Sequence, residues 1–338
     1  MTAPLALPAA DAASVTAYLK TRSLIPADPG DVRVTLLTGG VSGRVVLVEL
    51  GGARRMVLKT ARGRLQVQSP WYAKPERAVT EAAAMELLHG LRPGYTPELV
   101  DVDATAFTLV MSAAPAAMTS WKTRLLETQF EDASDEGVAA GLGRLLATWH
   151  RATWGDATVA GRFADYEGFV QLRIDPFHRS VAVRHPAVAD AIEACVQELL
   201  TDRSCLVHGD FSPKNVLVDG TQLLVLDFEV AHFGAPVFDL AFLHSHLLLK
   251  AVHRPTYRTH ISRVADAFVH AYHAGAVPVA AFSRLAQQVA CLLLARVDGT
   301  SPVAYLTEQQ QNRVRALALD CLRRDDLTLP KLWQDVTG

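Results

Sequence analysis

HGDFSPKN at positions 208–215, followed by LDFE at positions 226–229, is the stretch of this chain that decides its fold. The apolar segment 205–207 leads into the first motif, and the apolar segment 216–218 leaves it. After an Asp-Gly turn, another apolar run ends at the second motif. Short apolar runs bounded by turn residues are typical of strands. The pattern therefore predicts a strand, a polar loop and a hairpin whose last strand ends at an acidic motif.

The spacing H-x-D-x-x-x-x-N, with an aspartate just after the hairpin, brings together the groups that phosphoryl transfer needs. Asp210 can orient or deprotonate an attacking hydroxyl. Asn215 and Asp227 offer oxygen ligands of the kind that Mg²⁺ prefers. Glu229 follows two residues later, and it is either a further magnesium ligand or a carboxylate that supports the ligands.

Positions 208 to about 250 resemble the aminoglycoside phosphotransferase and choline kinase superfamily of small-molecule kinases. Its second signature, Gly-x-Pro-x-x-Asp-Leu-Ala, matches GAPVFDLA at positions 234–241. The Asp-x-Glu form at positions 227–229 is closer still to the 5-methylthioribose kinases. The resemblance implies a bilobal, protein-kinase-like α+β fold, with an antiparallel sheet and one helix in the N-lobe and a mainly helical C-lobe.

The same resemblance implies supporting roles around the first motif. Asp239 and His208 would orient the catalytic loop. Lys214, inside that loop, would either steady the γ-phosphate or face solvent. The loop ends in SPKN at positions 212–215, where methylthioribose kinases have His-Thr-Gly-Ser, so here the chain follows the wider superfamily.

The segments expected to bind the acceptor substrate carry no comparable motif. Arg173 and Asp175 lie in a polar and aromatic segment, where Pro176 is expected to interrupt any helix. The two side chains would either contact substrate hydroxyls or form a surface ion pair. Methylthioribose kinases carry an Arg-Arg pair near the C-terminal end, and only Arg296 matches it. Arg296 would lie in the cleft opposite Asp210, or on a helix surface paired with Asp298 or a neighbour.

The N-terminal part reads as an antiparallel meander of strands over positions 32–37, 45–50 and 55–59. The loop between the first two strands lacks the Walker pattern. It would either fold over nucleotide phosphates or form an ordinary hairpin turn. The loop residues that would approach the nucleotide phosphates are Gly39, Gly40, Ser42 and Gly43.

Lys59 ends the third strand, where a kinase places the lysine that contacts the nucleotide phosphates. Pro75 marks the start of a helix in which Glu81 shares a face with Met85 and Leu88. A charged residue on an inward face needs a partner. We therefore predict an ion pair between Lys59 and Glu81.

A further strand over positions 107–111 should lead into a hinge. The kinase resemblance implies that adenine hydrogen-bonds to backbone groups of Val110, Met111 and Ser112. The predicted organisation is an N-lobe (1–111) and a C-lobe (112–338) made of the hinge (112–120), a helical acceptor insert (121–204), the catalytic and metal loops (205–241) and C-terminal helices (242–338).

The composition is that of an ordinary globular protein. Its 338 residues are 50% hydrophobic, with 33 basic against 35 acidic side chains. This balance points to neither nucleic acid nor a membrane surface as a partner. The four cysteines lack C-x-x-C spacing and are expected to be free thiols. The N-terminus lacks the basic region of a signal peptide, so we expect a cytoplasmic protein. We expect this protein to be a monomer or a homodimer.

These features predict an ATP- and Mg²⁺-dependent kinase, with GTP as the alternative donor, acting on a small and plausibly sugar-like hydroxylated metabolite. One alternative is an aminoglycoside phosphotransferase that confers resistance. However, positions 154–185 hold four acidic residues against four arginines, which favours a neutral or anionic acceptor. A second alternative is a nucleotide-binding pseudokinase that acts as an interaction module. It is disfavoured because the catalytic set is complete, comprising Lys59, Glu81, Asp210, Asn215 and Asp227.

Overall fold

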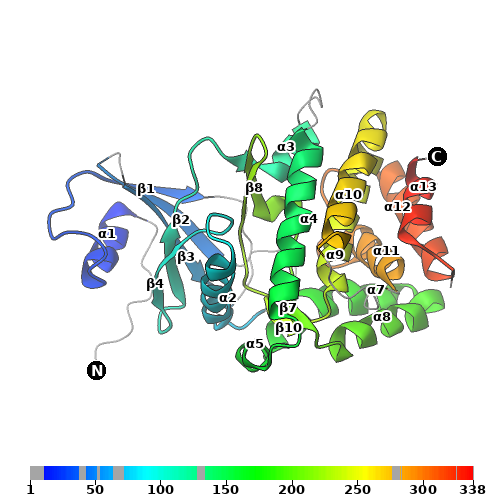
Figure 1. Ribbon diagram of the computed structural model, residues 1–338, viewed down its shortest axis with the longest axis horizontal. Coiled ribbons are helices and arrows are strands. Elements are labelled where there is room, and N and C mark those ends of the chain that lie inside the picture. The colour runs from blue at the N-terminus through cyan, green and yellow to red at the C-terminus, as the bar shows by residue number, and fades with distance from the viewer. Residues whose placement is uncertain are drawn as a thin grey trace. The chain divides into compact units, whose positions relative to one another are not determined.

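The computed structural model divides the chain into two compact units, Met1–Ala116 and Ala117–Gly338 (Figure 1). The residues that it describes are 11–37, 43–51, 54–63, 72–127, 134–275, 282, 284–324 and 326–337.

The first unit is built on a five-stranded antiparallel sheet with the strand order β1-β2-β3-β5-β4. Its strands are β1 (Val32–Leu37), β2 (Gly43–Leu50), β3 (Arg54–Ala61), β4 (Leu99–Asp103) and β5 (Thr108–Ser112). Burial alternates along β2, where Val46, Val48 and Leu50 are buried and their neighbours are partly exposed. This period of two gives the sheet one core face. The antiparallel meander predicted from the sequence is confirmed.

Two helices accompany this sheet. Helix α1 (Ala12–Thr21) buries Val15, Tyr18 and Leu19 in the same core cluster as the β2 and β3 side chains. Helix α2 (Arg77–Leu91) packs along β3, β4 and β5 (Figure 1). Burial of apolar side chains, at roughly 25 cal/mol per Å², holds both helices on the sheet.

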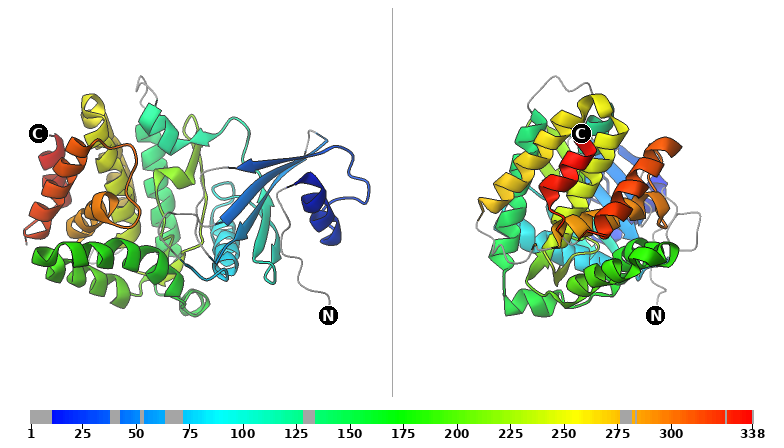
Figure 2. Two further views of the ribbon diagram at one scale, coloured as in Figure 1. Left: turned by 180° about the vertical axis from the view of Figure 1, so that it is seen from behind. Right: turned by 90° about the vertical axis from the view of Figure 1, so that its right-hand side faces the viewer.

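The second unit is mainly helical, as predicted. Helices α4 and α10 lie side by side, and the C-terminal helices α11, α12 and α13 gather next to α9 (Figure 2). Its helices are α3 (Trp121–Glu127), α4 (Ser134–Thr153), α5 (Ala157–Arg162), α6 (Glu167–Phe169), α7 (Ser180–Arg184), α8 (Ala189–Thr201), α9 (Val237–His253), α10 (Arg258–His273), α11 (Leu285–Asp298), α12 (Glu308–Leu322) and α13 (Leu329–Thr337).

Two small sheets hold the loops of the second unit. One has the order β6-β8-β9, and the other pairs β10 with β7. Their strands are β6 (Thr119–Ser120), β7 (Cys205–Val207), β8 (Val216–Asp219), β9 (Gln222–Val225) and β10 (His232–Gly234). In the β8–β9 hairpin Val216 pairs with Val225. Asn215, just before β8, therefore lies next to Leu226, just after β9. This is the strand-turn-strand arrangement that the sequence predicts after position 215.

Helix α9 is the central helix of the second unit. Every residue from Val237 to Val252 is buried. A helix that is apolar all round is typical of a protein core. Its five buried polar residues must therefore find partners inside the protein, namely Asp239, His244, Ser245, His246 and Lys250.

The expectation that Pro176 interrupts any helix is wrong. Residues Val170–Arg179 form a π-helix that joins α6 to α7 with Pro176 inside it. In this wide turn the N–H of Ser180 donates to the carbonyl of Asp175, five residues back. The carbonyl of Pro176 is used by the Ser180 hydroxyl at 2.6 Å and by the N–H of Thr300 at 3.2 Å. The wide turn accommodates the ring that a regular α-helix would exclude.

The four cysteines Cys195, Cys205, Cys291 and Cys321 are buried free thiols, as predicted. Among the helices of the described residues, none has the length and apolar character needed to span a bilayer.

Buried histidines predict an acid-sensitive fold. Burial lowers the pKa of His178 and of His232 to about 4, and that of His244 to about 3, from 6.5. At a pH between the folded and the unfolded pKa values, the unfolded chain therefore binds more protons than the folded protein. The free energy of unfolding thus falls as the pH drops from about 6.5 toward 4. The loss approaches about 3 kcal/mol per histidine once protonation is complete.

Urea unfolding at pH 7, 5.5 and 4.5 measures this loss. We expect the unfolding midpoint to fall steadily, and the variant His178→Asn to show a shallower decline. Equal midpoints at the three pH values would contradict the burial of neutral imidazoles.

Candidate active site

The loop after β7 is shaped by a glycine. Gly209 has φ +77°, and a Cβ atom there would lie 2.6 Å from the carbonyl oxygen of Val230. Only glycine combines this backbone conformation with so close an approach. The turn at Gly209 sets the position of Asp210 in the loop.

Asp239, in the first turn of α9, anchors this loop. Its Oδ2 accepts the N–H of His208 at 2.8 Å, and its Oδ1 accepts the N–H of Gly209 at 2.9 Å. Burial acts to raise the pKa of Asp239, but the hydrogen bond and charge of His150 together with the His208 contacts lower it below the ordinary value. A buried anion that accepts two backbone N–H groups holds a loop strongly. These two bonds tie Asp239 to the loop backbone, and its orienting role stays a prediction.

His208 links the two motifs. Its Nε2 donates to the carbonyl of Leu226 at 3.1 Å, and its Nδ1 accepts the N–H of Asp210 at 3.1 Å. Burial lowers the pKa of His208, which suits a neutral ring with one donor and one acceptor. His150, near the end of α4, is buried and bonds to Tyr272 and Asp239.

Asp210 is 2% exposed, and one of its two oxygens is crowded with donors. Its Oδ2 lies 3.0 Å from Arg173 Nη2, 3.0 Å from Lys214 Nζ and 2.8 Å from Asn215 Nδ2. None of the described residues donates a hydrogen bond to Oδ1. The carboxylate is thus held through one oxygen and presents the other.

Asn215 and Asp227 are brought together by the β8–β9 hairpin. The N–H of Leu226 donates to the carbonyl of Asn215 at 2.9 Å. Because Asn215 uses Nδ2 toward Asp210, its Oδ1 is the atom that can face a cation. Asp227 has φ +71°, a conformation that costs most residues energy but that Asp and Asn tolerate. Backbone strain of this kind often marks functional positions.

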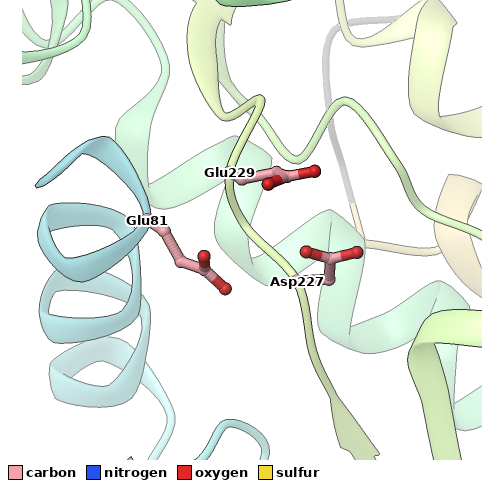
Figure 3. A group of neighbouring side chains, drawn as sticks. All are labelled: Glu81, Asp227 and Glu229. Atoms are coloured by element: carbon pink, nitrogen blue, oxygen red, sulfur yellow. The ribbon is translucent and has the colours of Figure 1, made fainter. Parts of the chain in front are cut away.

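Glu229 adds a second carboxylate. Asp227 and Glu229 rise from the same segment after β9, and each offers an oxygen within 4.8 Å of the other (Figure 3). Glu229 is buried, whereas Asp227 is partly exposed. Two carboxylates this close together fit a hard divalent cation such as Mg²⁺, which prefers oxygen ligands.

The first unit contains the predicted ion pair. Lys59 Nζ on β3 lies 2.8 Å from Glu81, which projects from α2 and is 3% exposed (Figure 3). Gly43 begins β2, and a Cβ atom there would lie 2.7 Å from the carbonyl oxygen of Thr60. Three residues of the predicted glycine-rich loop lie outside the described residues, namely Gly39, Gly40 and Ser42.

The predicted adenine-contacting segment is the end of β5. Val110 and Met111 are buried, and the N–H of Ser112 donates to the carbonyl of Glu98 at 2.9 Å. The Ser112 hydroxyl in turn accepts the N–H of Glu98 at 2.9 Å. The N–H of Ser112 is thus already used within the sheet, and the adenine contact of this segment stays a prediction.

A family model described as a phosphotransferase enzyme family matches residues 33–282. The chain belongs to this family. The superfamily predicted from the sequence is thereby confirmed, and the protein is a phosphotransferase. The likeness to 5-methylthioribose kinases stays a prediction.

Solved structures agree with this fold. The microcompartment-associated aminopropanol kinase is 19% identical with a TM-score of 0.55, and the match covers 96% of this chain and 99% of that one. An amicoumacin kinase in complex with AMP-PNP and Ca²⁺ is 12% identical with a TM-score of 0.54, covering 91% and 93%. The macrolide 2'-phosphotransferase MphH from Brachybacterium faecium is 20% identical with a TM-score of 0.52, covering 90% and 98%. Identities this low establish the fold alone. No curated protein matches the chain.

In this phosphotransferase Arg173 and Asp175 lie in different surroundings. Arg173 is buried and donates to the carbonyls of Gly209 at 2.8 Å and Leu172 at 2.7 Å, besides contacting Asp210. Asp175 is exposed and pairs with Arg179 at 2.7 Å. The surface ion pair offered as one alternative therefore applies to Asp175 and not to Arg173.

Arg296 of the phosphotransferase does not pair with Asp298. Asp298 is bound by Arg315 at 2.7 Å and by His185 at 2.9 Å. Arg296 instead donates to the carbonyl of Ser301 at 2.6 Å. Burial lowers the pKa of Arg296, and the negative charge of Asp210 partly opposes the shift. The charge of Asp210 therefore acts on Arg296, but the bond to Ser301 is a pairing with a neighbour, so the position of Arg296 in the cleft stays a prediction.

The sequence analysis missed a group of polar residues near this arginine. His246 and Lys250 of α9 are buried, and no role in the site was predicted for either of them from the sequence. The available signal was a charged residue inside a helix that is otherwise apolar all round.

Proposed function

We propose that this phosphotransferase moves the γ-phosphoryl group of ATP to a hydroxyl of a small metabolite, with Asp210 as the catalytic base. The observation that carries the proposal is the state of the Asp210 carboxylate. Three donors hold Oδ2, while Oδ1 takes no hydrogen bond from the described residues. That oxygen can accept a hydrogen bond from the acceptor hydroxyl.

The reaction then follows from this geometry. The hydroxyl oxygen forms a bond to the γ-phosphorus as the bond to the β,γ-bridging oxygen breaks, and ADP leaves. The hydroxyl proton passes to Oδ1 of Asp210 late in the transfer. Asp239 acts as a positioning residue, because it holds the backbone of the loop that carries Asp210.

Asn215, Asp227 and Glu229 would hold Mg²⁺, and we propose that Lys59, paired with Glu81, contacts the nucleotide phosphates. When bound, the metal supplies charge neutralisation on the phosphates. The amicoumacin kinase that this chain resembles is in complex with AMP-PNP, which supports ATP as the donor. An aspartate that keeps a left-handed backbone conformation also supports a functional role.

The surroundings of Asp210 bear on the acceptor. Arg173 and Lys214 contact its carboxylate, and Arg296 lies within electrostatic reach. Cations around the base would repel a polycationic aminoglycoside. They support a neutral or anionic hydroxylated acceptor such as a sugar derivative. The completeness of the catalytic set argues against a pseudokinase.

Acceptor-dependent release of ADP tests this function. The panel contains ribose, methylthioribose, ribose 5-phosphate, glycerate, ethanolamine and kanamycin, each with Mg²⁺ and ATP. We expect ADP release to rise above the acceptor-free rate with a sugar-like or anionic compound and not with kanamycin. The same slow release with every compound would contradict a kinase, and turnover with kanamycin alone would instead identify the aminoglycoside alternative.

A further inference from the structure

Lys250 is a buried basic residue with no acidic partner among the residues that the structure describes. Its side chain on α9 is 1% exposed, and its Nζ donates to the carbonyl of His246 at 3.1 Å. Burial, together with the charges of Lys122 and Arg296, lowers the pKa of Lys250 from 10.5 to about 7. Burying an ammonium group beside other cations is costly. Such a group is usually kept for a ligand or a reaction.

Other basic side chains surround the same point. Burial lowers the pKa of His246, and so do the positive charges of Lys250, Arg296, Lys214 and Lys122. These residues come from α9, α11, the catalytic loop and α3. Segments far apart in the sequence thus bring several basic groups together, next to the loop that carries the catalytic base.

Three buried polar atoms at this place have no hydrogen-bond partner among the described residues. They are Nε of Arg296, Oη of Tyr305 and Nδ1 of His253. The ring of Tyr305 lies 5.0 Å from that of His253 and 5.9 Å from Lys250 Nζ. Arg296 is close enough to Tyr305 for its charge to oppose the rise that burial causes in the tyrosine pKa. Buried polar atoms are nearly always satisfied, so unsatisfied ones gathered in one place indicate a missing partner.

We propose that Lys250, Arg296, Tyr305 and His253 form a subsite for an anionic group of the acceptor, a carboxylate or a phosphate. The inference rests on the proposed function and deepens it by naming the substrate class. An oxyanion offers several acceptor atoms and would satisfy these donors with charge-assisted bonds. Arg296 and Arg173 both lie against the ring of Phe177, at 5.8 and 5.7 Å from its centroid, and Arg173 contacts Asp210. The acceptor would therefore place its hydroxyl at Asp210 and its anionic group at Lys250.

Inorganic phosphate is the first probe. Thermal unfolding of the full chain is followed in phosphate and in chloride at equal ionic strength. We expect phosphate to raise the midpoint of the wild type. Lys250→Met should weaken the apparent phosphate affinity about tenfold, since a charge-assisted bond is lost. The exposed Lys20 in the first unit provides the matched control Lys20→Met, which should behave as wild type.

Lys250→Met should fold, because replacing a buried charge with an apolar side chain of similar length is often neutral or stabilising. Tyr305→Phe removes only the unsatisfied hydroxyl and serves as a second, conservative variant. It should weaken phosphate binding by a few fold. Phosphate protection that is absent in the wild type, or unchanged in both variants, would overturn the subsite.

A second experiment compares the turnover of paired anionic and neutral acceptors. D-glycerate is compared with glycerol, and ribose 5-phosphate with ribose, so that a carboxylate and a phosphate are tested separately. The anionic member of at least one pair should have the higher kcat/KM. Lys250→Met should erase this preference through KM for the acceptor and leave KM for ATP unchanged. Turnover of the neutral members alone would overturn the subsite while the kinase function stands, and a raised KM for ATP would assign these residues to the nucleotide instead.

Discussion

Asp210→Asn should lower kcat by about 10²–10⁴-fold, the usual contribution of a positioned general base. The amide keeps the size of the carboxylate, but it cannot take the hydroxyl proton. Arg173 retains its bonds to the carbonyls of Gly209 and Leu172, so the loop should keep its shape. Nucleotide affinity should therefore stay close to that of the wild type. Stopped-time assays of ADP and calorimetry of Mg-ATP binding measure the two quantities.

Asp175→Asn is the matched control for this variant. Asp175 lies on the π-helix two residues from Arg173, but it is exposed and pairs only with Arg179 among the described residues. Its substitution should leave kcat within about twofold, as expected for a surface change. Wild-type turnover in Asp210→Asn would remove Asp210 from the mechanism.

Asp227→Asn should weaken Mg-ATP binding on the order of 100-fold, because loss of even a supporting group costs 10–100-fold in metal affinity. Asparagine is the better substitution than alanine here, since it also tolerates the left-handed backbone at φ +71°. The fold should therefore be preserved while the charge is lost. Calorimetry with Mg²⁺ and with a chelator separates metal-dependent from metal-independent nucleotide binding.

The control lies in the same hairpin. Asp219, at the end of β8, is exposed and faces Gln222 across the turn. Asp219→Asn should bind Mg-ATP like the wild type. If Asp227→Asn retained full magnesium-dependent affinity, Asp227 would not be a metal ligand.

Features that depend on short-range spacing could be predicted from the sequence. The Lys59–Glu81 ion pair follows from one strand end and one helical face, and the structure joins these residues at 2.8 Å. The contact of Asp239 with the catalytic loop follows from the second signature and a buried helix start. In both cases a charge placed in an apolar setting limits its possible partners.

Features that depend on long-range packing could not be predicted. Arg173 and Asp175 are two residues apart and lie on opposite sides of the helical turn, one buried at Asp210 and the other facing solvent. The helix break expected at Pro176 left no helical faces from which to assign them. Lys250 and Tyr305 meet only through the packing of α9 against the segment after α11. A helix buried all round has no polar face, so periodicity gives no direction for Lys250.

The transfer itself can be followed by phosphorus NMR of a mixture of enzyme, Mg-ATP and the acceptor that releases most ADP. The account predicts that the γ-phosphate resonance is replaced by a phosphomonoester of the acceptor, in step with ADP, and that Asp210→Asn slows this exchange by the factor by which it lowers kcat. Appearance of the γ-phosphoryl group only as inorganic phosphate, at the same rate with and without acceptor, would contradict it.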